Sequence, residues 1–479
     1  RNFIISWAHQ FPQFGWLIPV LFAATCALIA VAITRRFAPE ASGSGIPHIE
    51  AVLMRFRQLD WKRVLPVKFL AGIIGIGGGL ALGREGPTVQ MGGAVGDAIS
   101  RLLKVTERER LVLISAGSGA GLAAVFNAPL SGLIFVLEEV RRDFQPIVFG
   151  AAFIAAVVAD IIARIGSNQF PVFSVPSYPV PPLTSLPIFA ILGVIAGLLG
   201  VLFNKSLLAV VNLFARIPTK YILPVAAVTG GVIGLVGWFT PSLIGSGNSL
   251  AESVLKGDLI LAVIPVFFIL RLLMTTTSYG TGAPGGIFAP LLVLGAMIGL
   301  AIGQIANSLD PTIAPIPAIF AVVGMAAYFT AIVRAPLTGI MLIVEMTGNY
   351  AQMLPLLVSC FCAYAVAEFL NDLPIYEALL ERDLRKAGNS LPIKEPVVVE
   401  FIIHEGAPFA GLLVSSLGLP AGCILVRCSD GKHEWVPKAS TRLEAHMHVT
   451  AVIAPDAENG LELLRNGCLG TDRSREYSV

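Results

Sequence analysis

The chain has 479 residues, of which 55% are hydrophobic and 13% are charged, and its mean hydropathy is +0.78. A soluble domain carries about 25% charged residues, so this composition excludes an ordinary soluble fold. The net charge of +2 does not point to nucleic acid, and the six scattered cysteines have neither metal-ligand spacing nor a disulfide framework. We therefore expect an integral membrane protein without a metal site, a cofactor or a nucleic-acid partner.

Apolar runs close to the roughly 20 residues that span a bilayer recur along the chain. They are Trp16–Thr34, Leu65–Leu82, Leu111–Leu137, Ile147–Ile165, Pro187–Val211, Leu223–Phe239, Leu259–Met274, Ala289–Ile305, Ala318–Val333 and Met353–Leu370. The 48 glycines and 32 prolines predict broken helices, which survive in lipid only where protein or a water-filled cavity satisfies their backbone. We predict an all-α polytopic membrane domain over residues 1–386, with broken and re-entrant helices. The last run is followed by basic residues that the positive-inside rule places in the cytoplasm, namely Arg382, Arg385 and Lys386.

Two stretches of this domain carry related motifs in the same order. The first contains GSGIP from Gly43 and GREGP from Gly83, and the second contains GSGNS from Gly245 and GGIFAP from Gly285, at the same spacing. The predicted repeats cover about residues 16–211 and 222–380. Paired interrupted segments in corresponding halves of a membrane protein predict a transport site near the middle of the bilayer.

The GSGIP motif has the composition of a helix start that approaches a ligand. Ser44 is a good N-cap, Pro47 suits the first helical turn, and Gly45 lets the backbone come close to a bound group. The free N–H groups of a helix N-terminus, here starting at Ile46, attract an anion. The alternative is an ordinary capped turn.

The GREGP motif places Arg84 and Glu85 between Gly83 and Gly86, inside an otherwise uncharged stretch. Ionisable side chains at membrane depth are costly and are functional candidates by default. A carboxylate at a helix N-terminus occupies the anion site itself, and its protonation releases that site. Glu85 is therefore predicted to be both a gate and a proton carrier. The alternative is an ion pair of Arg84 with Glu85 or Glu50 that only stabilises the fold.

The GGIFAP motif is the uncharged counterpart in the second repeat. The backbone N–H groups of residues 285–288 precede a predicted helix at 289–305, so an anion there would be bound by backbone donors. The overlapping glycine pattern Gly280–Gly285 follows no clear strand and contains a proline, which argues against a nucleotide site.

Glu138 and Glu139 end a long apolar run, where a pair of acids is ordinarily a solvated interfacial cluster. Alignment of the two repeats matches Glu138 with Glu345, but it matches Glu139 with Met346. The shared acid, Glu138, is predicted to serve the architecture, and Glu139 is the better functional candidate. Tyr376, after the final apolar run, is predicted to reach back into a pore as a hydroxyl donor, with an interfacial anchor as the alternative.

After Ala387 the composition changes to short runs rich in Val and Ile. The segments VVVEFIIHEG, GCILVRCS and HVTAVIAP predict strands in a small cytoplasmic α+β domain over residues 387–479. The tail around Glu462–Leu464 is poorly periodic and is expected to be frayed. His446 and His448 alternate on a predicted strand, where facing solvent is the alternative to binding a metal.

Taken together, the motifs resemble those of the CLC family of chloride channels and chloride/proton antiporters. GSGIP, GREGP and GIFAP stand unaltered in family order, and FNAPLSG (Phe126–Gly132) and Tyr376 also match. The resemblance covers about residues 16–380. It implies a homodimer with one pore per subunit, in which each subunit is an inverted repeat of tilted, partly re-entrant helices. It also implies another helix before the one at Trp16–Thr34.

The same resemblance implies a role for each matching residue. The hydroxyls of Ser44 and Tyr376 would bind a central chloride together with backbone N–H groups, and Glu85 would be the gating glutamate of an outer site. Glu139 would match the inner proton glutamate that family antiporters have and family channels generally lack. The implied chloride-binding residues are Ser44, Gly45, Ile46, Gly83, Arg84, Gly86, Ile287, Phe288 and Tyr376.

The sequence therefore predicts a chloride/proton antiporter of a bacterial inner membrane. A passive chloride channel of the same fold is the alternative. A membrane enzyme is the rival from another class, and it is disfavoured because the six histidines form no cluster inside the apolar runs. Residues 397–455 are similar to the C-terminal ligand-binding subdomain of potassium-transport regulators, which implies an unidentified ligand, with a dimerising cap as the alternative.

Overall fold

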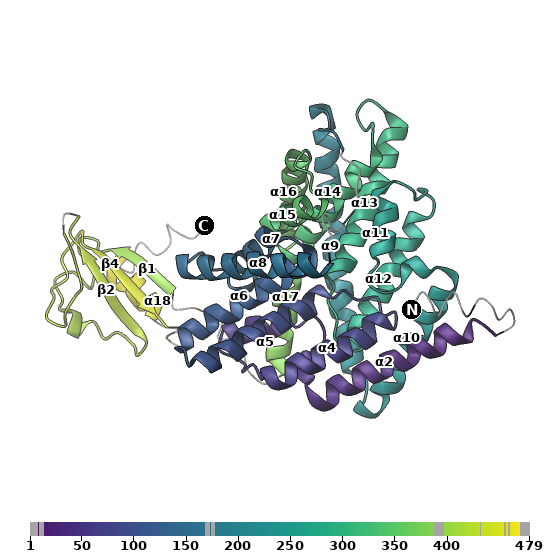
Figure 1. Cartoon of the computed structure of the whole chain (residues 1–479). Coiled ribbons are helices and arrows are strands. Elements are labelled where there is room, and N and C mark those ends of the chain that lie inside the picture. The colour runs from purple at the N-terminus through teal and green to yellow at the C-terminus, as the bar shows by residue number, and fades with distance from the viewer. Residues whose placement is uncertain are drawn as a thin grey trace. The chain divides into compact units, whose positions relative to one another are not determined.

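In a computed structural model the chain forms two compact units, Arg1–Leu380 and Glu381–Val479. The structure describes residues 14–167, 178–386, 397–431, 433–454 and 460–469, and the single residues Ala8, Phe173 and Ala457. The first unit is helical and the second contains a four-stranded sheet (Figure 1). The division falls inside the helix α17, slightly before the boundary predicted after residue 386.

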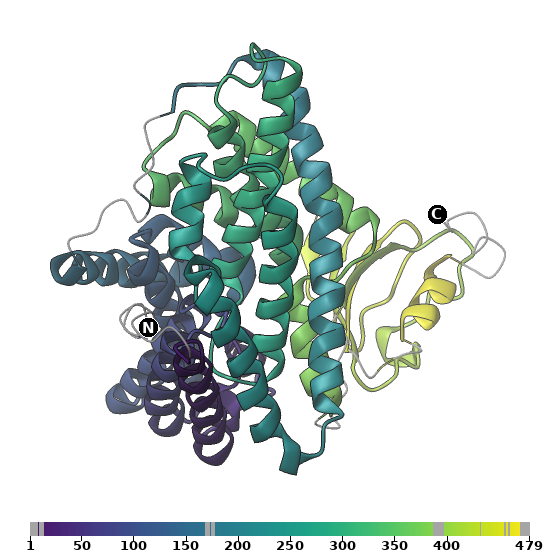
Figure 2. The ribbon, with the colours of Figure 1, turned by 90° about the vertical axis from the view of Figure 1, so that its right-hand side faces the viewer.

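The described part of the first unit is built from helices of very different length. Seven of them are long and apolar enough to cross a bilayer, and α9, with 30 residues, is visible as the long blue-teal helix in Figure 2. The helices are α2 (Leu17–Phe37), α3 (Ile46–Leu53), α4 (Trp61–Gly77), α5 (Glu85–Leu103), α6 (Glu107–Phe126), α7 (Pro129–Phe135), α8 (Pro146–Ser167), α9 (Leu186–Ala215), α10 (Ile222–Phe239), α11 (Asn248–Leu255), α12 (Ile264–Gly280), α13 (Phe288–Leu309), α14 (Pro317–Val333), α15 (Pro336–Thr347), α16 (Met353–Phe369) and α17 (Ile375–Lys386).

Some predicted spans are divided by breaks that the apolar pattern does not reveal. The run Leu111–Leu137 becomes α6 and α7, because Asn127 takes a left-handed conformation (φ 50°) and Pro129 starts the next helix. A π-helical turn at Val136–Val140 follows α7 directly. The predicted spans omit α5, whose apolar residues are interrupted by Gly, Asp and Ser, although this helix carries Glu85 at its first position.

Two helix pairs approach so closely that only glycine fits between them. Between α13 and α14, a Cβ at Gly299 would lie 1.9 Å from the carbonyl oxygen of Phe320. Between α5 and α6, a Cβ at Gly92 would lie 2.0 Å from the carbonyl oxygen of Gly117. Small residues at helix crossings are a general means of packing in lipid. They fix α5 and α13, the two helices whose N-termini meet in the site.

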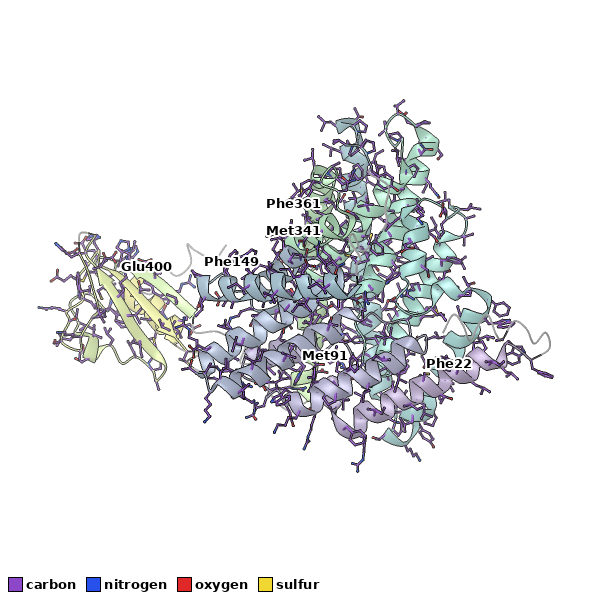
Figure 3. All side chains as sticks on the ribbon, in the orientation of Figure 1. Phe22, Met91, Phe149, Met341, Phe361 and Glu400 are labelled. Carbon is purple, nitrogen blue, oxygen red and sulfur yellow. The ribbon has the colours of Figure 1, made fainter. Side chains whose placement is uncertain are left out.

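Large apolar side chains cover outer surfaces of this unit. On α8 and α16, Phe149 and Phe361 are 48% and 71% exposed (Figure 3). An apolar surface of this kind is unfavourable in water and suits lipid or a partner chain. α14 shows the opposite pattern, because every residue of Ala318–Val333 is buried. This helix therefore lies at the centre of the unit.

The second unit is an antiparallel sheet in the order β1-β4-β2-β3 with one helix. Its elements are β1 (Val397–Ile402), β2 (Cys423–Ser429), β3 (Glu434–Trp435), β4 (His448–Ile453) and α18 (Gly460–Leu469). The three predicted strands and the α+β class are confirmed. The prediction of a frayed tail is wrong, because α18 buries Leu464 and Cys468 in the same apolar core as Val449 and Ala451.

The two histidines near β4 do not form the predicted alternating pair. β4 begins at His448, while His446 precedes it in a left-handed conformation (φ 67°). His448 Nδ1 lies 3.5 Å from the Oε1 of Glu400 on β1. Across the part of the chain that the structure describes, no three metal-ligating side chains gather into one group.

Candidate functional site

The site begins with backbone contacts between loops of the two predicted repeats. Gly83 and Gly286 exchange two hydrogen bonds of 2.7 Å, one in each direction. The N–H of Gly285 donates to the carbonyl oxygen of Gly43 at 2.9 Å. GSGIP, GREGP and GGIFAP are far apart in the sequence, and these bonds hold them side by side.

Ser44 is fully buried in the loop that leads into α3. The helix begins at Ile46 and its N-cap is Gly45 in a left-handed conformation (φ 84°), so the prediction of Ser44 as the N-cap is wrong. The N–H of Ile46 nevertheless donates to the Ser44 hydroxyl at 3.4 Å. Close contacts require the neighbouring glycines, since a Cβ at Gly45 would lie 2.3 Å from Gln90 Oε1 and a Cβ at Gly86 would lie 2.7 Å from Ser44 Cβ.

A buried lysine stabilises this loop. Lys68 on α4 is fully buried, and its Nζ donates to the carbonyl oxygens of Ala41 at 2.9 Å and Gly43 at 2.7 Å. Lys68 is absent from the predicted site residues. Its charge inside the predicted span Leu65–Leu82 is the sequence signal that could have revealed it.

Glu85 is the first residue of α5 and is 2% exposed. Its Oε2 accepts a hydrogen bond of 3.4 Å from the N–H of Ala289, in the first turn of α13. The backbone N–H groups of Arg84 and of Glu85 itself also hold the carboxylate, and among the described residues no ion pair joins it to the Arg84 side chain. Gly83 makes room for it, because a Cβ there would lie 2.0 Å from Glu85 Oε2. The carboxylate therefore occupies a helix N-terminus, where negative charge is stabilised.

A small pocket borders this carboxylate. Arg84, Glu85, Asn248 and Val293 are among the residues that line it. Arg84 is exposed, whereas Glu85 is buried. The pocket lining thus combines an exposed positive charge from Arg84 with the buried carboxylate of Glu85.

The N-terminus of α13 supplies further backbone donors. The helix begins at Phe288 with Ile287 as its N-cap. The N–H groups of Gly285 and Gly286 already donate to carbonyl oxygens of the other loops, so the prediction that they are available to an anion is wrong. Those of Ile287 and Phe288 remain, because the first N–H groups of a helix have no acceptor within the helix.

Tyr376 lies in the first turn of α17 and is fully buried. The alternative of an interfacial anchor is therefore wrong. Within the described residues its hydroxyl has no hydrogen-bond partner, and the phenol interacts electrostatically with both Glu85 and Glu139. The loop before it is fixed by Asn204, whose Nδ2 donates to Asp372 Oδ2 at 2.7 Å.

Glu139 lies in the π-helical turn and is 3% exposed, so the alternative of a solvated interfacial acid is wrong for this residue. Arg142 Nη2 lies 3.9 Å from Glu139 Oε2, and Arg142 Nη1 lies 2.9 Å from the Oε2 of Glu377 on α17. Arg142 and Glu377 are both partly exposed. Arg142 thus links the buried Glu139 to a partly exposed acid, and no sequence pattern predicts this pair. Glu50 is a second buried acid that interacts electrostatically with Glu139.

Glu138 has the architectural role that the repeats predict. Its carboxylate accepts hydrogen bonds from the N–H and hydroxyl of Thr338, at 2.7 and 2.8 Å, and so caps the first turn of α15. Glu345 does the same for α7, through the N–H and hydroxyl of Ser131 at 2.7 and 2.5 Å. The two matching acids therefore cap each other's repeat.

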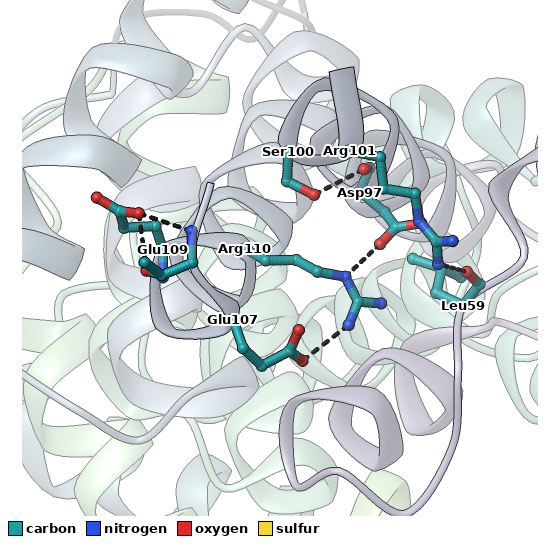
Figure 4. A network of polar contacts seen from close by, with 8 residues as sticks. Leu59, Asp97, Ser100, Arg101, Glu107, Glu109 and Arg110 are labelled. Carbon is teal, nitrogen blue, oxygen red and sulfur yellow. Dashed lines mark hydrogen bonds and ion pairs between the residues drawn. The ribbon is translucent and has the colours of Figure 1, made fainter. Parts of the chain in front are cut away.

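The far end of α5 is fixed by the ion-pair network that Figure 4 shows. Asp97 is fully buried and lies 2.9 Å from Arg101 Nε and 2.6 Å from Arg110 Nε. Arg110 also pairs with Glu107 at 2.8 Å. Because Asp97 belongs to α5 and Arg110 to α6, the network holds the two helices together. It thereby fixes the helix that carries Glu85 at its other end.

Both units match known families. Residues 26–368 match the voltage gated chloride channel family, which is most of the chain. The chain belongs to the voltage gated chloride channel family. Residues 398–464 match the TrkA-C domain. The resemblances drawn for the membrane domain and for the tail are therefore confirmed.

Relatives in the chloride channel family are similar over about three quarters of the chain. The H(+)/Cl(-) exchange transporter ClcA of Vibrio parahaemolyticus serotype O3:K6 is 44% identical over 376 residues, which cover 77% of this chain and 80% of that protein. The protein of the same name from Salmonella paratyphi A is 39% identical over 378 residues, which cover 78% of this chain and 80% of that protein.

Solved structures of the family share the fold. A slow cyanobacterial Cl-/H+ antiporter superposes with a TM-score of 0.77 at 37% identity, covering 81% of this chain and 93% of that one. A eukaryotic CLC transporter gives a TM-score of 0.68 at 23% identity, over 80% of this chain and 69% of that one. The predicted CLC fold class is confirmed.

Proposed function

We propose that this chain is a chloride/proton antiporter, which moves chloride across the membrane in exchange for protons. The observation that carries the proposal is the position of the Glu85 carboxylate, which accepts a hydrogen bond from the N–H of Ala289 at the N-terminus of α13. An anion would bind at the same donors. Glu85 and chloride would then compete for one set of donors. Because protonation of Glu85 ends this competition, chloride binding is coupled to proton binding. The H(+)/Cl(-) exchange activity in the names of its relatives supports the same function.

The chloride route runs through neutral donors. The central site takes the hydroxyls of Ser44 and Tyr376, both fully buried, and an anion in such a place requires hydrogen bonds. Lys68 fixes the Ser44 loop through the carbonyl oxygens of Ala41 and Gly43. The backbone of the helix starts provides the other contacts, at Gly45, Ile46, Arg84, Gly86, Ile287 and Phe288. The N–H of Gly83 donates to the carbonyl oxygen of Gly286, so the predicted Gly83 contact is left out.

Protonation of Glu85 is the step that exchanges one ion for the other. When Glu85 is ionised, its carboxylate accepts the hydrogen bond from the N–H of Ala289 and excludes chloride from the helix terminus. When it is protonated, it loses its charge and its attraction to that terminus. The side chain then leaves, chloride takes its place, and the carboxyl group carries the proton.

Glu139 is the inner proton site of this scheme. Protons reach it past the partly exposed pair of Arg142 and Glu377. Tyr376 interacts electrostatically with both Glu85 and Glu139, so the central chloride site lies near both acids. Transient water carries the proton between them, and the chloride beside it offsets part of the cost of a positive charge in a buried place.

Glu85→Gln is expected to abolish proton movement while chloride still passes, because glutamine keeps the size of the side chain but carries no proton. The measurement is proton uptake by liposomes that contain the full chain, under an imposed chloride gradient. Glu252→Gln is the matched control, since Glu252 is exposed on α11. Uphill proton movement that survives in Glu85→Gln would defeat the proposed mechanism, and chloride flux without protons in the wild type would indicate a passive channel.

We further propose a homodimer in a bacterial inner membrane, with the second unit in the cytoplasm. The exposed apolar side chains of α8 and α16, such as Phe149 and Phe361, suit a partner in the bilayer. Arg382 and Arg385 at the end of α17 favour the cytoplasmic side. The TrkA-C match supports a regulatory role for the second unit with a ligand that is still unidentified.

A further inference from the structure

A second tyrosine reaches the loop that carries Ser44. Tyr279 lies in the last turn of α12 and is 8% exposed. Its hydroxyl oxygen lies 3.5 Å from Ser44 Oγ and 3.5 Å from Ser44 N. Tyr279, which belongs to the second repeat, thus contacts Ser44, which belongs to the first repeat.

The phenol fits against the loop because Gly43 has no side chain, and hydrogen bonds to the Gly43 carbonyl oxygen fix the loop in place. A Cβ at Gly43 would lie 2.9 Å from the Tyr279 hydroxyl oxygen and 3.0 Å from Cζ. The carbonyl oxygen of Gly43 is held by Lys68 Nζ at 2.7 Å and by the N–H of Gly285 at 2.9 Å. The first glycine of GSGIP is therefore required by the ring of Tyr279, and the contact is built into the fold.

Three buried hydroxyl groups belong to this part of the protein. Ser44 lies in the loop before α3, Tyr279 lies on α12 and Tyr376 lies on α17. The two phenols are close enough to interact electrostatically. Tyr376 is fully buried and, within the described residues, its hydroxyl has no hydrogen-bond partner. Buried hydroxyl protons gain most from an acceptor that lies between them.

We propose that Tyr279 is a third hydroxyl donor to the central anion, beside Ser44 and Tyr376, and that it contributes to anion affinity and selectivity. The inference rests on the proposed function, because it needs a chloride at Ser44. The direct contact between Ser44 and Tyr279 is at the long limit of a hydrogen bond. An anion that accepts from both hydroxyls therefore replaces a weak contact by two charge-assisted ones.

Tyr279→Phe tests this role because it removes the hydroxyl and keeps the ring against Gly43. Chloride binding to the full chain in detergent, measured by titration calorimetry, is expected to weaken about tenfold, as the loss of one hydrogen bond to a charged group predicts. Tyr376→Phe should weaken it to a similar extent. Tyr328→Phe is the matched control, since Tyr328 is also buried, on α14, and its hydroxyl donates to the carbonyl oxygen of Leu199.

Selectivity separates a donor from a residue that only supports the loop. Thiocyanate spreads its charge and depends less on hydroxyl donors, so Tyr279→Phe should weaken thiocyanate binding less than chloride binding. A supporting role would weaken both equally. Equal chloride affinity in Tyr279→Phe and Tyr328→Phe would overturn the inference, whereas absence of chloride binding in the wild type would overturn the proposed function.

A measurement on the wild-type protein tests the same inference if the Tyr279→Phe variant does not fold. Bromide in a crystal of the full chain gives anomalous density at the central site. We expect that density within hydrogen-bond distance of the hydroxyls of Tyr279, Ser44 and Tyr376. Bromide that contacts only Ser44 and Tyr376 would overturn the inference.

Discussion

Single glycines decide where functional side chains can lie in this protein. A Cβ at Gly83 would lie 2.0 Å from Glu85 Oε2, and a Cβ at Gly43 would lie 2.9 Å from the Tyr279 hydroxyl oxygen. Gly43 also has a φ of 61°, which strains any other residue. Both positions are therefore restricted by the side chains that they make room for, and Gly43 is also restricted by its backbone conformation.

Gly83→Ala is expected to displace Glu85 from the N-terminus of α13, because the new methyl group takes the place of a carboxylate oxygen. Chloride flux through liposomes should lose most of its dependence on pH, and the crowding should cost about 1–3 kcal/mol of stability.

Gly77→Ala is the control for that variant, since a Cβ at Gly77 meets nothing within 4 Å. It should retain both the pH dependence and the stability of the wild type. A Gly83→Ala protein with unchanged pH dependence would contradict the position assigned to Glu85.

At the scale of whole elements, the two repeats share devices that hold the helix starts. Glu138 caps α15 and Glu345 caps α7. Lys68 donates to the loop before α3, and Arg271 Nη1 donates to the carbonyl oxygen of Leu243 before α11 at 2.6 Å. These groups are buried and polar, yet their contacts lie within the scaffold. Burial of charge at membrane depth alone therefore does not mark the transported ions' path.

Glu138→Gln and Glu345→Gln are expected to destabilise the protein to a similar extent, because the amide presents one acceptor where the carboxylate accepts several bonds. The loss should be about 2 kcal/mol, the value of a hydrogen bond to a charged group. Thermal unfolding in detergent measures it, with Glu252→Gln as the control.

The ratio of protons to chloride in both cap variants should equal that of the wild type. A changed ratio in Glu138→Gln with full stability would show that Glu138 takes part in transport, against its architectural role.

The elements that the sequence could predict are those with a local signal. Long apolar runs predict helices such as α9 and α14, and Val/Ile runs predict β1, β2 and β4. Breaks such as the one at Asn127 depend on a single residue in a left-handed conformation, which an apolar run conceals. α18 is short and poorly periodic, and only its packing against the sheet makes it a helix.

The candidate site divides in the same way. Motif residues near helix starts, such as Glu85 and Ile287, were predictable because N-terminal chemistry is local. Contacts between distant segments were not predictable. Examples are the ion pair of Arg142 with Glu377 and the contact of Tyr279 with Ser44. Propensity and periodicity carry no information about such contacts.

At the scale of the whole molecule, a repeated scaffold carries an asymmetric site. The acids that cap α7 and α15 match between the repeats, but Glu139 matches Met346. Backbone bonds between Gly83 and Gly286 join the halves, and the ion ligands then come from both. The account places one acid, Glu85, at the helix terminus that binds anions and another, Glu139, behind a partly exposed ion pair. Coupled exchange requires both.

Proton movement driven by a chloride gradient tests that claim most directly, in liposomes that contain either the wild type, Glu139→Gln or Glu252→Gln. The account predicts uphill proton movement in the wild type and in Glu252→Gln. It predicts that Glu139→Gln loses this movement while chloride flux persists. Proton movement in Glu139→Gln at the wild-type level, or chloride flux without protons in the wild type, would contradict it.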